Sequence, residues 1–90
     1  MKALAIKVEG RVQGVGFRYF VQTAAAKHQI TGWVRNTSDG NVEIEAEGAE
    51  TDLDAFIRDV QQGSPFSRVA FVQVSELPSL PHYDKFQIKY

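Results

Sequence analysis

The sequence predicts an α+β fold in which two helices cover one face of a mostly antiparallel sheet, and three observations support this expectation. Several segments alternate apolar and polar residues, which is typical of strands with one buried and one solvated face. Two segments carry apolar residues at helical spacing. Along the chain these segments give the order β-α-β-β-α-β, with the last strand unit in two pieces. This is the order of the split β-α-β, ferredoxin-like two-layer sandwich.

The composition bounds both the number of domains and the classes of function. Ninety residues predict one domain, residues 1–90, with no room for a second core. The absence of cysteine excludes disulfides, thiolate nucleophiles and thiolate metal sites. A net charge of −1 argues against broad electrostatic binding to nucleic acid or to acidic membranes. Any recognition of an anion is therefore expected to be local.

No apolar run approaches the length of a membrane span, and the N-terminus shows no signal-peptide pattern. Together with the lack of cysteine, these features predict a cytoplasmic protein without a membrane partner. Nothing in the sequence pattern requires a partner chain, so we expect a monomer.

The first expected strand covers residues 2–9, where Leu4, Ile6 and Val8 alternate with polar residues. A glycine-rich loop, residues 10–18, follows this strand. From Phe17 the period changes, and apolar residues at helical spacing predict a helix over residues 17–27. The buried face of this helix is expected to carry Phe17, Phe20, Val21, Ala24 and His28.

The second and third expected strands form a hairpin. Residues 30–36 make the second strand, and the Asp39-Gly40 pair within residues 38–41 is a strong hairpin signal. In the third strand, Val42, Ile44 and Ala46 alternate with Glu43, Glu45 and Glu47. The glutamates are interpreted as a solvated row rather than as a metal site, because divalent cations need converging oxygen ligands.

The second half of the chain predicts a helix and two strands. Thr51 followed by Asp54 resembles a capping box at the start of the helix, and Gly63 and Pro65 are expected to end it. The buried stripe of this helix is expected to consist of Leu53, Phe56, Ile57 and Val60. Residues 68–77 are strand-like, but apolar residues compete for both faces, which predicts a bulge. Phe86, Ile88 and Tyr90 alternate with polar residues in a last strand.

The loop of residues 10–18, Gly-Arg-Val-Gln-Gly-Val-Gly-Phe-Arg, is the main candidate for a binding site. At a strand-to-helix junction, free backbone N–H groups and the positive end of the helix dipole both favour an anion. Arg18 lies in the first turn of the helix, where its charge opposes the dipole unless an anion sits in front of it. A guanidinium beside such N–H groups makes a good phosphate site.

The predicted topology places a second polar residue at this loop. The first and second strands run parallel with the third strand between them, so Asn36 and the glycine loop are expected at the same edge of the sheet. Two strand spacings put the two backbones about 10 Å apart. Taken alone, Asn36 is a turn former and Arg18 a surface charge. The histidines, His28 and His82, are interpreted as packing or surface residues.

Two motifs seen together resemble the signature segments of the acylphosphatase family. The first is Val8-x-Gly10-x-Val12-Gln13-Gly14-Val15-x-Phe17-Arg18, and the second is Gly32-Trp33-Val34-Arg35-Asn36-x-x-x-Gly40-x-Val42, followed by Gly48. Gly63-Ser64-Pro65 and the closing Phe86-x-Ile88-x-Tyr90 are also similar to the family. Order, spacing and length agree over essentially the whole chain.

The resemblance implies an acid-anhydride hydrolase that converts an acyl phosphate to carboxylate and phosphate without a metal, a cofactor or a covalent intermediate. Arg18 would bind the phosphate and Asn36 would orient the attacking water. The backbone N–H groups that would hold the phosphoryl oxygens belong to Gly14, Val15, Gly16, Phe17 and Arg18. The implied partners are a small acyl phosphate substrate and inorganic phosphate, as product and competitive inhibitor, with no nucleic acid.

A non-catalytic ferredoxin-like module that binds an anion or a nucleic acid is the alternative function, since RNA-recognition domains share this topology. The third strand carries glutamates where such domains need stacked aromatic and basic residues. A degenerate family member kept for a partner is a third alternative, and the presence of both Arg18 and Asn36 argues against it.

Overall fold

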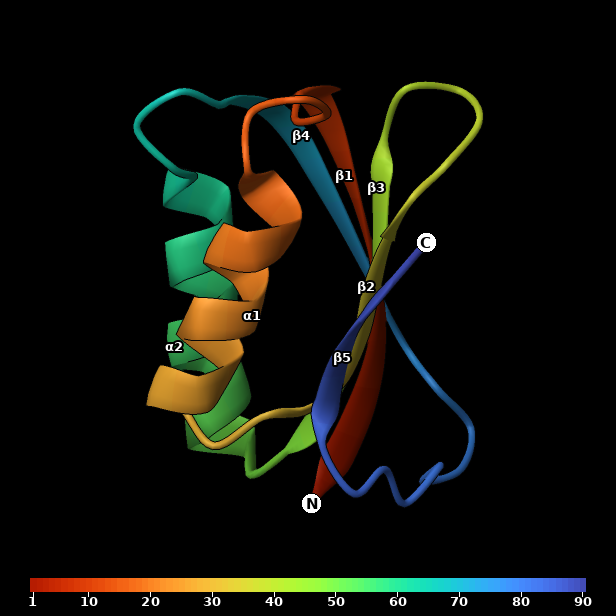
Figure 1. Cartoon of the computed structure of the whole chain (residues 1–90). Helices are drawn as coiled ribbons and strands as arrows, with labels where there is room; N and C mark the ends of the chain where they lie inside the picture. The colour runs from red at the N-terminus through yellow and green to blue at the C-terminus, as the bar shows by residue number, and fades with distance from the viewer.

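The computed structural model describes all of residues 1–90 and shows two helices packed on one face of a five-stranded sheet (Figure 1). The elements are β1 (Lys2–Arg11), α1 (Phe17–Lys27), β2 (Thr31–Asn36), β3 (Val42–Gly48), α2 (Glu50–Gln62), β4 (Arg68–Glu76) and β5 (Phe86–Lys89). The expected ferredoxin-like fold class is confirmed, including the division of the last strand unit into two pieces. Neither helix combines the length and the apolar character needed to cross a membrane.

The sheet has the strand order β4-β1-β3-β2-β5. Strand β3 pairs antiparallel with both β1 and β2, so β1 and β2 run in the same direction on either side of it, as predicted. The β1–α1 loop and the β2–β3 hairpin therefore lie at the same end of the molecule, the upper end in Figure 1. Strand β5 adds parallel to β2 and forms one edge of the sheet.

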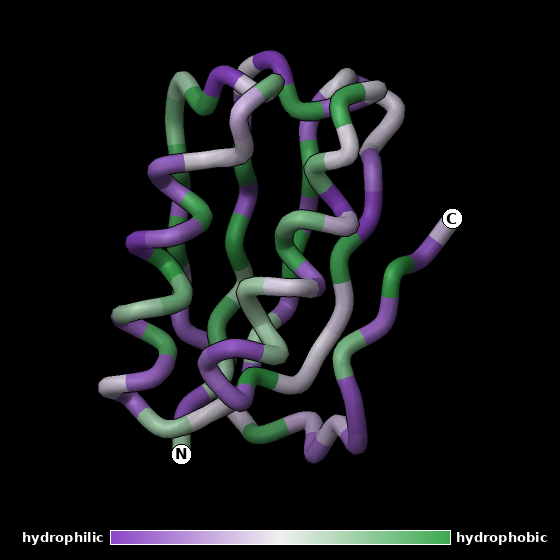
Figure 2. Tube along the Cα trace, turned by 60° about the vertical axis from the view of Figure 1, so that its left-hand side comes forward, coloured by the Kyte–Doolittle hydropathy of each residue, from purple (hydrophilic) through white to green (hydrophobic).

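The core lies between the helices and the covered face of the sheet. The apolar positions predicted for β1 and β3 are buried there, whereas Tyr90, expected on the same face of the last strand, is exposed. Figure 2 shows the change between hydrophobic and hydrophilic residues along the strands. The largest fully buried side chains are Phe17, Phe56, Ile6, Ile44 and Leu53. Each such side chain contributes about 1.5–3 kcal/mol of transfer free energy on burial, so this layer holds the sheet against the helices.

Helix α1 has the predicted bounds. Its buried residues include Phe17, Val21 and Ala24, and the ring of His28, at its C-terminal end, lies 2.8 Å from the Asp59 carboxylate of α2. His28 therefore links the two helices, in agreement with its interpretation as a packing residue.

The predicted capping box of the second helix is wrong. Helix α2 begins at Glu50, one residue before Thr51, and its N-cap residue Ala49 offers no side-chain hydrogen bond. The Ala49 carbonyl accepts the first helical bond, from the Leu53 N–H at 2.9 Å. Two acidic residues in the first turn, Glu50 and Asp52, instead compensate the positive end of the helix dipole.

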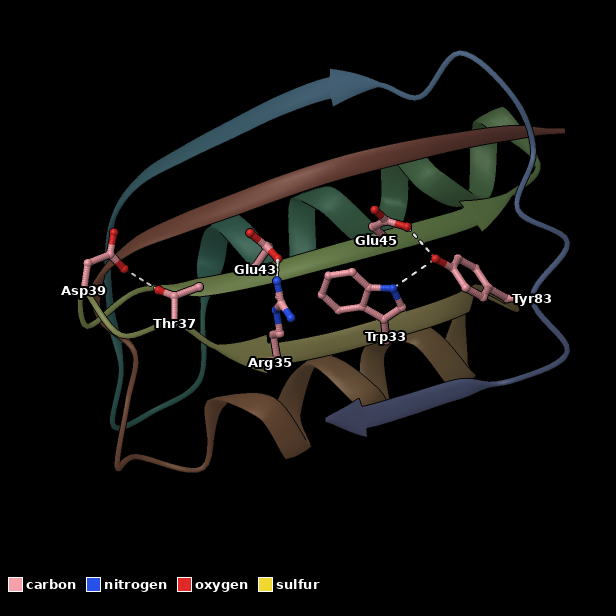
Figure 3. Close-up of polar contacts among 7 residues, drawn as sticks. All are labelled: Trp33, Arg35, Thr37, Asp39, Glu43, Glu45 and Tyr83. Carbon is pink, nitrogen blue, oxygen red and sulfur yellow. Dashed lines mark hydrogen bonds and ion pairs between the residues drawn. The ribbon is translucent and has the colours of Figure 1, made fainter. Parts of the chain in front are cut away.

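The predicted solvated row of glutamates is also wrong at one position. Glu47 is only 3% exposed, because the chain between β4 and β5 folds over this end of the open face. The Tyr83 backbone N–H donates to Glu47 Oε1 at 3.0 Å, and the Tyr83 hydroxyl donates to Glu45 and accepts from Trp33 Nε1 (Figure 3). Burial, with help from the Glu45 carboxylate, raises the pKa of Tyr83. The residue alternation predicted which face of the sheet each glutamate occupies. It did not predict that the chain between β4 and β5 covers Glu47.

The predicted bulge is confirmed. Strand β4 pairs antiparallel with β1, and the register shifts between Glu9 and Gly10, opposite residues 69–71. This extra residue explains why Val69 and Val72 both contact the core although their spacing breaks the strand alternation.

One glycine of β2 makes a testable contribution to stability. Gly32 has φ +140°, and a Cβ there would lie 1.9 Å from the Glu45 carbonyl oxygen of β3. Gly32→Ala should therefore lower the free energy of unfolding by about 3 kcal/mol or more, since backbone atoms must shift. Gly40→Ala is the matched control: its φ is +89°, but the space is open, and about 1 kcal/mol is expected. Urea denaturation measures both, and equal losses would contradict the steric argument.

Candidate active site

A pocket of about 170 Å³ lies where the β1–α1 loop meets the end of β2. It is lined by Val12, Gly14, Gly16, Phe17, Arg18, Tyr19, Asn36, Ile88 and Tyr90. The structure thus brings Arg18, Asn36 and most of the predicted cradle around one cavity. The remaining cradle residue, Val15, packs its side chain against the core beside the pocket.

The backbone N–H groups of the loop that lines this pocket have no partner among the loop and turn hydrogen bonds. Gly14 and Gly16 have φ of +72° and +74°, a left-handed conformation that favours glycine, and a Cβ at either position would meet no atom within 4 Å. Gly16 is the N-cap of α1 and supplies no capping side chain. None of the N–H groups of residues 14–18 donates to a loop or turn carbonyl. Free N–H groups at a helix N-terminus suit an anion, as the sequence predicts for residues 14–18.

Arg18 adds a charged donor beside these N–H groups. Its Nη1 atom donates to the Lys89 carbonyl at 3.2 Å, and its guanidinium carbon lies 4.7 Å from the centre of the Tyr90 ring. The end of β5 therefore holds the guanidinium at the pocket. Because the guanidinium carries five N–H donors in a planar fork, one bond to Lys89 leaves others for a phosphate-sized anion.

Asn36 is the last residue of β2, and its side chain makes no hydrogen bond within the chain. Its Oδ1 atom is buried and unpaired. An unpaired buried amide oxygen costs about 1–3 kcal/mol, so the group gains stability from any partner that it can reach. A half turn of the amide exchanges its oxygen and nitrogen with little change of shape, which lets either the acceptor or the donor face the pocket.

Several residues at the site were not predicted from the sequence. Tyr19, Ile88 and Tyr90 line the pocket, and the Lys89 carbonyl accepts from Arg18. The alternation of the last strand predicted β5 but not its parallel pairing with β2, which places its end beside Arg18. The only available signal was the motif-like ending Phe86-x-Ile88-x-Tyr90.

The lining residues limit the chemistry of the pocket. They offer backbone N–H groups, one guanidinium, one carboxamide and two tyrosine side chains, but no serine, no histidine and no side-chain carboxylate. No group of three or more His, Asp or Glu side chains gathers elsewhere to hold a metal ion. The arrangement suits binding an anion and orienting a neutral molecule beside it, rather than forming a covalent intermediate.

The hairpin next to Asn36 carries an unusually acidic carboxyl group. The Thr37 hydroxyl donates to Asp39 (Figure 3), and Lys7 lies 3.4 Å away, so the pKa of Asp39 falls from 3.8 to about 2. Because the folded-state pKa is the lower one, the associated stability is present above about pH 4 and is lost as the pH falls through about 2.

Replacing Thr37 by valine tests this assignment. Thr37→Val should raise the pKa of Asp39 toward 3.8, and the acid-dependent loss of stability should shrink with it. NMR titration of the Asp39 carboxyl carbon measures the pKa in both proteins. An unchanged titration curve would assign the effect to Lys7 instead.

Comparisons with known proteins all identify one family, and the matches cover nearly the whole chain. A family model described as acylphosphatase matches residues 4–88, a range that includes the glycine loop and Asn36. An acylphosphatase from Bacillus licheniformis is 59% identical over 85 residues, which is 94% of each chain. The crystal structure of an acylphosphatase from Bacillus subtilis covers 100% of both chains with a TM-score of 0.97 at 52% identity. An acylphosphatase structure from Coxiella burnetii has a TM-score of 0.93 at 33% identity, over 98% of this chain and 92% of its own.

Proposed function

The chain belongs to the acylphosphatase family, and on this premise we propose that it hydrolyses a small acyl phosphate to a carboxylate and inorganic phosphate. The observation that carries the proposal is the pocket shared by the glycine loop, Arg18 and Asn36. These groups come from two segments of the chain, residues 10–18 and the end of β2, and each group supplies something that phosphoryl transfer to water requires. The alternative of a non-catalytic binding module does not account for this family membership.

The loop and Arg18 bind the phosphoryl group. The N–H groups of residues 14–18 and the guanidinium hold its oxygens, supported by the free donors and the left-handed glycines described above. Phosphoryl transfer is served mainly by positioning and by stabilising charge on the equatorial oxygens. Donors fixed in place before the reaction supply that stabilisation without reorganising at the moment of transfer.

Asn36 orients the attacking water. A carboxamide is no base at neutral pH, but its oxygen accepts a hydrogen bond from water and fixes the line of attack on phosphorus. The lack of a partner for Asn36 Oδ1 within the chain supports this role, because no intramolecular bond must be broken before the oxygen accepts one from water.

The leaving group needs no protonation. A carboxylic acid has a pKa of about 4, so the carboxylate departs unprotonated at neutral pH and no general acid is required. The reaction also needs no nucleophilic side chain, which fits the lining of the pocket. We therefore propose a direct, metal-independent attack of water on phosphorus, in line with the departing carboxylate.

All of the proposed groups come from one chain, so the monomer is the catalytic unit. We further propose that the protein acts in the cytoplasm on a small-molecule substrate. The net charge of −1 supports a binding site confined to the pocket rather than a charged surface for a macromolecule.

A direct assay tests the proposal. The purified protein should hydrolyse benzoyl phosphate in a buffer with a chelator and without added metal, at the same rate as without the chelator. Asn36→Ala, assayed beside it, controls for a contaminating hydrolase, because a contaminant would be equally active in both preparations. Folded wild-type protein without activity would contradict the proposed function.

Inorganic phosphate should inhibit this activity competitively. As the product it occupies the same N–H groups and the same guanidinium as the phosphoryl group of the substrate. Initial rates at several phosphate and substrate concentrations should therefore show a rising KM at constant kcat. Inhibition that lowers kcat alone would place phosphate at another site.

A further inference from the structure

The side-chain amide of Gln13 joins the glycine loop to the hairpin that follows Asn36. Gln13, the residue before the cradle, donates from Nε2 to the carbonyls of Thr37 at 2.8 Å and of Asn41 at 2.7 Å. These carbonyls lie 24 and 28 residues further along the chain, at the base of the β2–β3 hairpin. Thr37 directly follows Asn36, so a single side chain links the phosphate loop to the strand that ends in Asn36. Figure 1 shows the loop and the hairpin together at the upper end of the molecule.

The Lys7–Asp39 ion pair, at 3.4 Å, joins β1 to the hairpin, but the loop itself is joined only by Gln13. The two Gln13 bonds are the only hydrogen bonds between the β1–α1 loop and the hairpin, and both hydrogens of the amide nitrogen are used. Strand β3 lies between β1 and β2, so no sheet pairing fixes the loop against β2 directly. The Thr37 N–H also donates to the Asn41 carbonyl, at 3.0 Å, which makes the base of the hairpin a fixed platform.

We infer that Gln13 is a positioning residue that sets the distance between the phosphate cradle and Asn36, a role that rests on the proposed function. The phosphorus atom is fixed by the loop, and the attacking water is fixed by Asn36. Their relative placement therefore depends on how the loop is joined to the hairpin. A misplacement of about 1 Å between reacting groups can lower a rate by about 10²-fold. The Gln13 amide can therefore affect turnover without contacting the substrate.

The test replaces Gln13 by methionine, which has a similar shape and no donor. Gln13→Met should lower kcat for benzoyl phosphate by about 10- to 50-fold. The inhibition constant for phosphate should change by less than about twofold, because the cradle N–H groups and Arg18 remain attached to α1. This split between kcat and phosphate affinity is not expected from a purely structural residue, whose loss would affect the folded fraction or the whole site.

A double-mutant cycle shows whether Gln13 acts through Asn36. In the Asn36→Ala background the further change Gln13→Met should cost less than about twofold in kcat, because the group that it positions is already gone. An equal cost in both backgrounds, an unchanged kcat in the single variant, or parallel losses of kcat and phosphate affinity would each overturn the inference.

Gln22, which lies on α1, offers a matched control. Its Nε2 atom donates to the Phe86 carbonyl at 3.4 Å and joins α1 to β5, without contacting the hairpin. Gln22→Met removes the same chemical group and one long-range bond, and both kcat and phosphate affinity should stay at wild-type values.

Phosphate binding followed by NMR separates this inference from the proposed function. In the wild type, phosphate should shift the backbone amide signals of residues 14–18 and the side-chain amide signal of Asn36. In Gln13→Met the loop signals should still shift and the Asn36 signal should not. This result would support the coupling even if the wild type proved inactive, and an Asn36 shift of equal size in both proteins would refute it.

Discussion

Arg18→Lys is expected to lower kcat/KM for benzoyl phosphate by about 10²–10³-fold, the cost of removing one preorganised donor from a charged transition state. The guanidinium donates to the Lys89 carbonyl and stacks on Tyr90, and its planar fork leaves further N–H groups for phosphoryl oxygens. A lysine ammonium is a point charge on a flexible stem, so it cannot keep the β5 contact and hold the phosphoryl group in one fixed geometry.

The Arg18 variant should also lose affinity for inorganic phosphate, by about tenfold, since a charge-assisted bond is weakened. Steady-state kinetics with phosphate as inhibitor measures both effects. Arg35→Lys is the matched control, because Arg35 pairs with Glu43 at 2.7 Å on the open face of the sheet and lies outside the pocket. Unchanged kinetics in Arg18→Lys, or equal losses in the two variants, would remove Arg18 from the mechanism.

The fold could be predicted because four of its elements, β1, β3 and both helices, have a regular amphipathic pattern. The apolar positions of β1, β3 and both helices repeat at the periods of one-sided strands and helices, so local pattern alone located them. Because β1 and β2 run parallel on either side of β3 in this topology, the element order alone also places Asn36 beside the glycine loop. The proximity of the two motifs in the candidate site follows from these two steps.

The contacts that local pattern could not predict all join segments far apart in the chain. Glu47 was expected in solvent, but its burial depends on Tyr83, 36 residues away. The Arg18–Lys89 contact spans 71 residues and depends on the pairing of β5 with β2. The residue alternation of β5 does not determine which edge of the sheet this strand joins. Gln13 appeared only as a motif letter, since a side-chain amide that bonds two backbone carbonyls leaves no signature at either partner.

These long-range contacts share a physical role. Arg18 and the glycine loop have many accessible conformations by composition, with glycines at positions 14 and 16 and a long side chain at 18. Each is held by a remote backbone carbonyl, at Lys89 for the arginine and at Thr37 and Asn41 for the loop. A site built from backbone donors therefore gains its rigidity from tertiary structure rather than from the local sequence.

Asn36→Ala is expected to lower kcat by about 10²–10³-fold while the inhibition constant for phosphate changes by less than about twofold. Asn36 forms no hydrogen bond with the proposed cradle, so its loss removes the orientation of water but leaves the phosphate donors in place. This pattern differs from that expected for Arg18→Lys, in which phosphate affinity and turnover both fall.

The same substitution should cost little stability. The Asn36 side chain has no hydrogen-bond partner within the chain, so truncation orphans no donor and removes one buried unpaired oxygen. Urea denaturation should therefore give a free energy of unfolding within about 1 kcal/mol of wild type. Thr31→Ala, at the opposite end of β2, controls for truncating a polar residue of this strand. A variant that keeps its stability and loses only turnover would mark Asn36 as a residue retained for chemistry, whereas equal loss of phosphate affinity would contradict its role in orienting water.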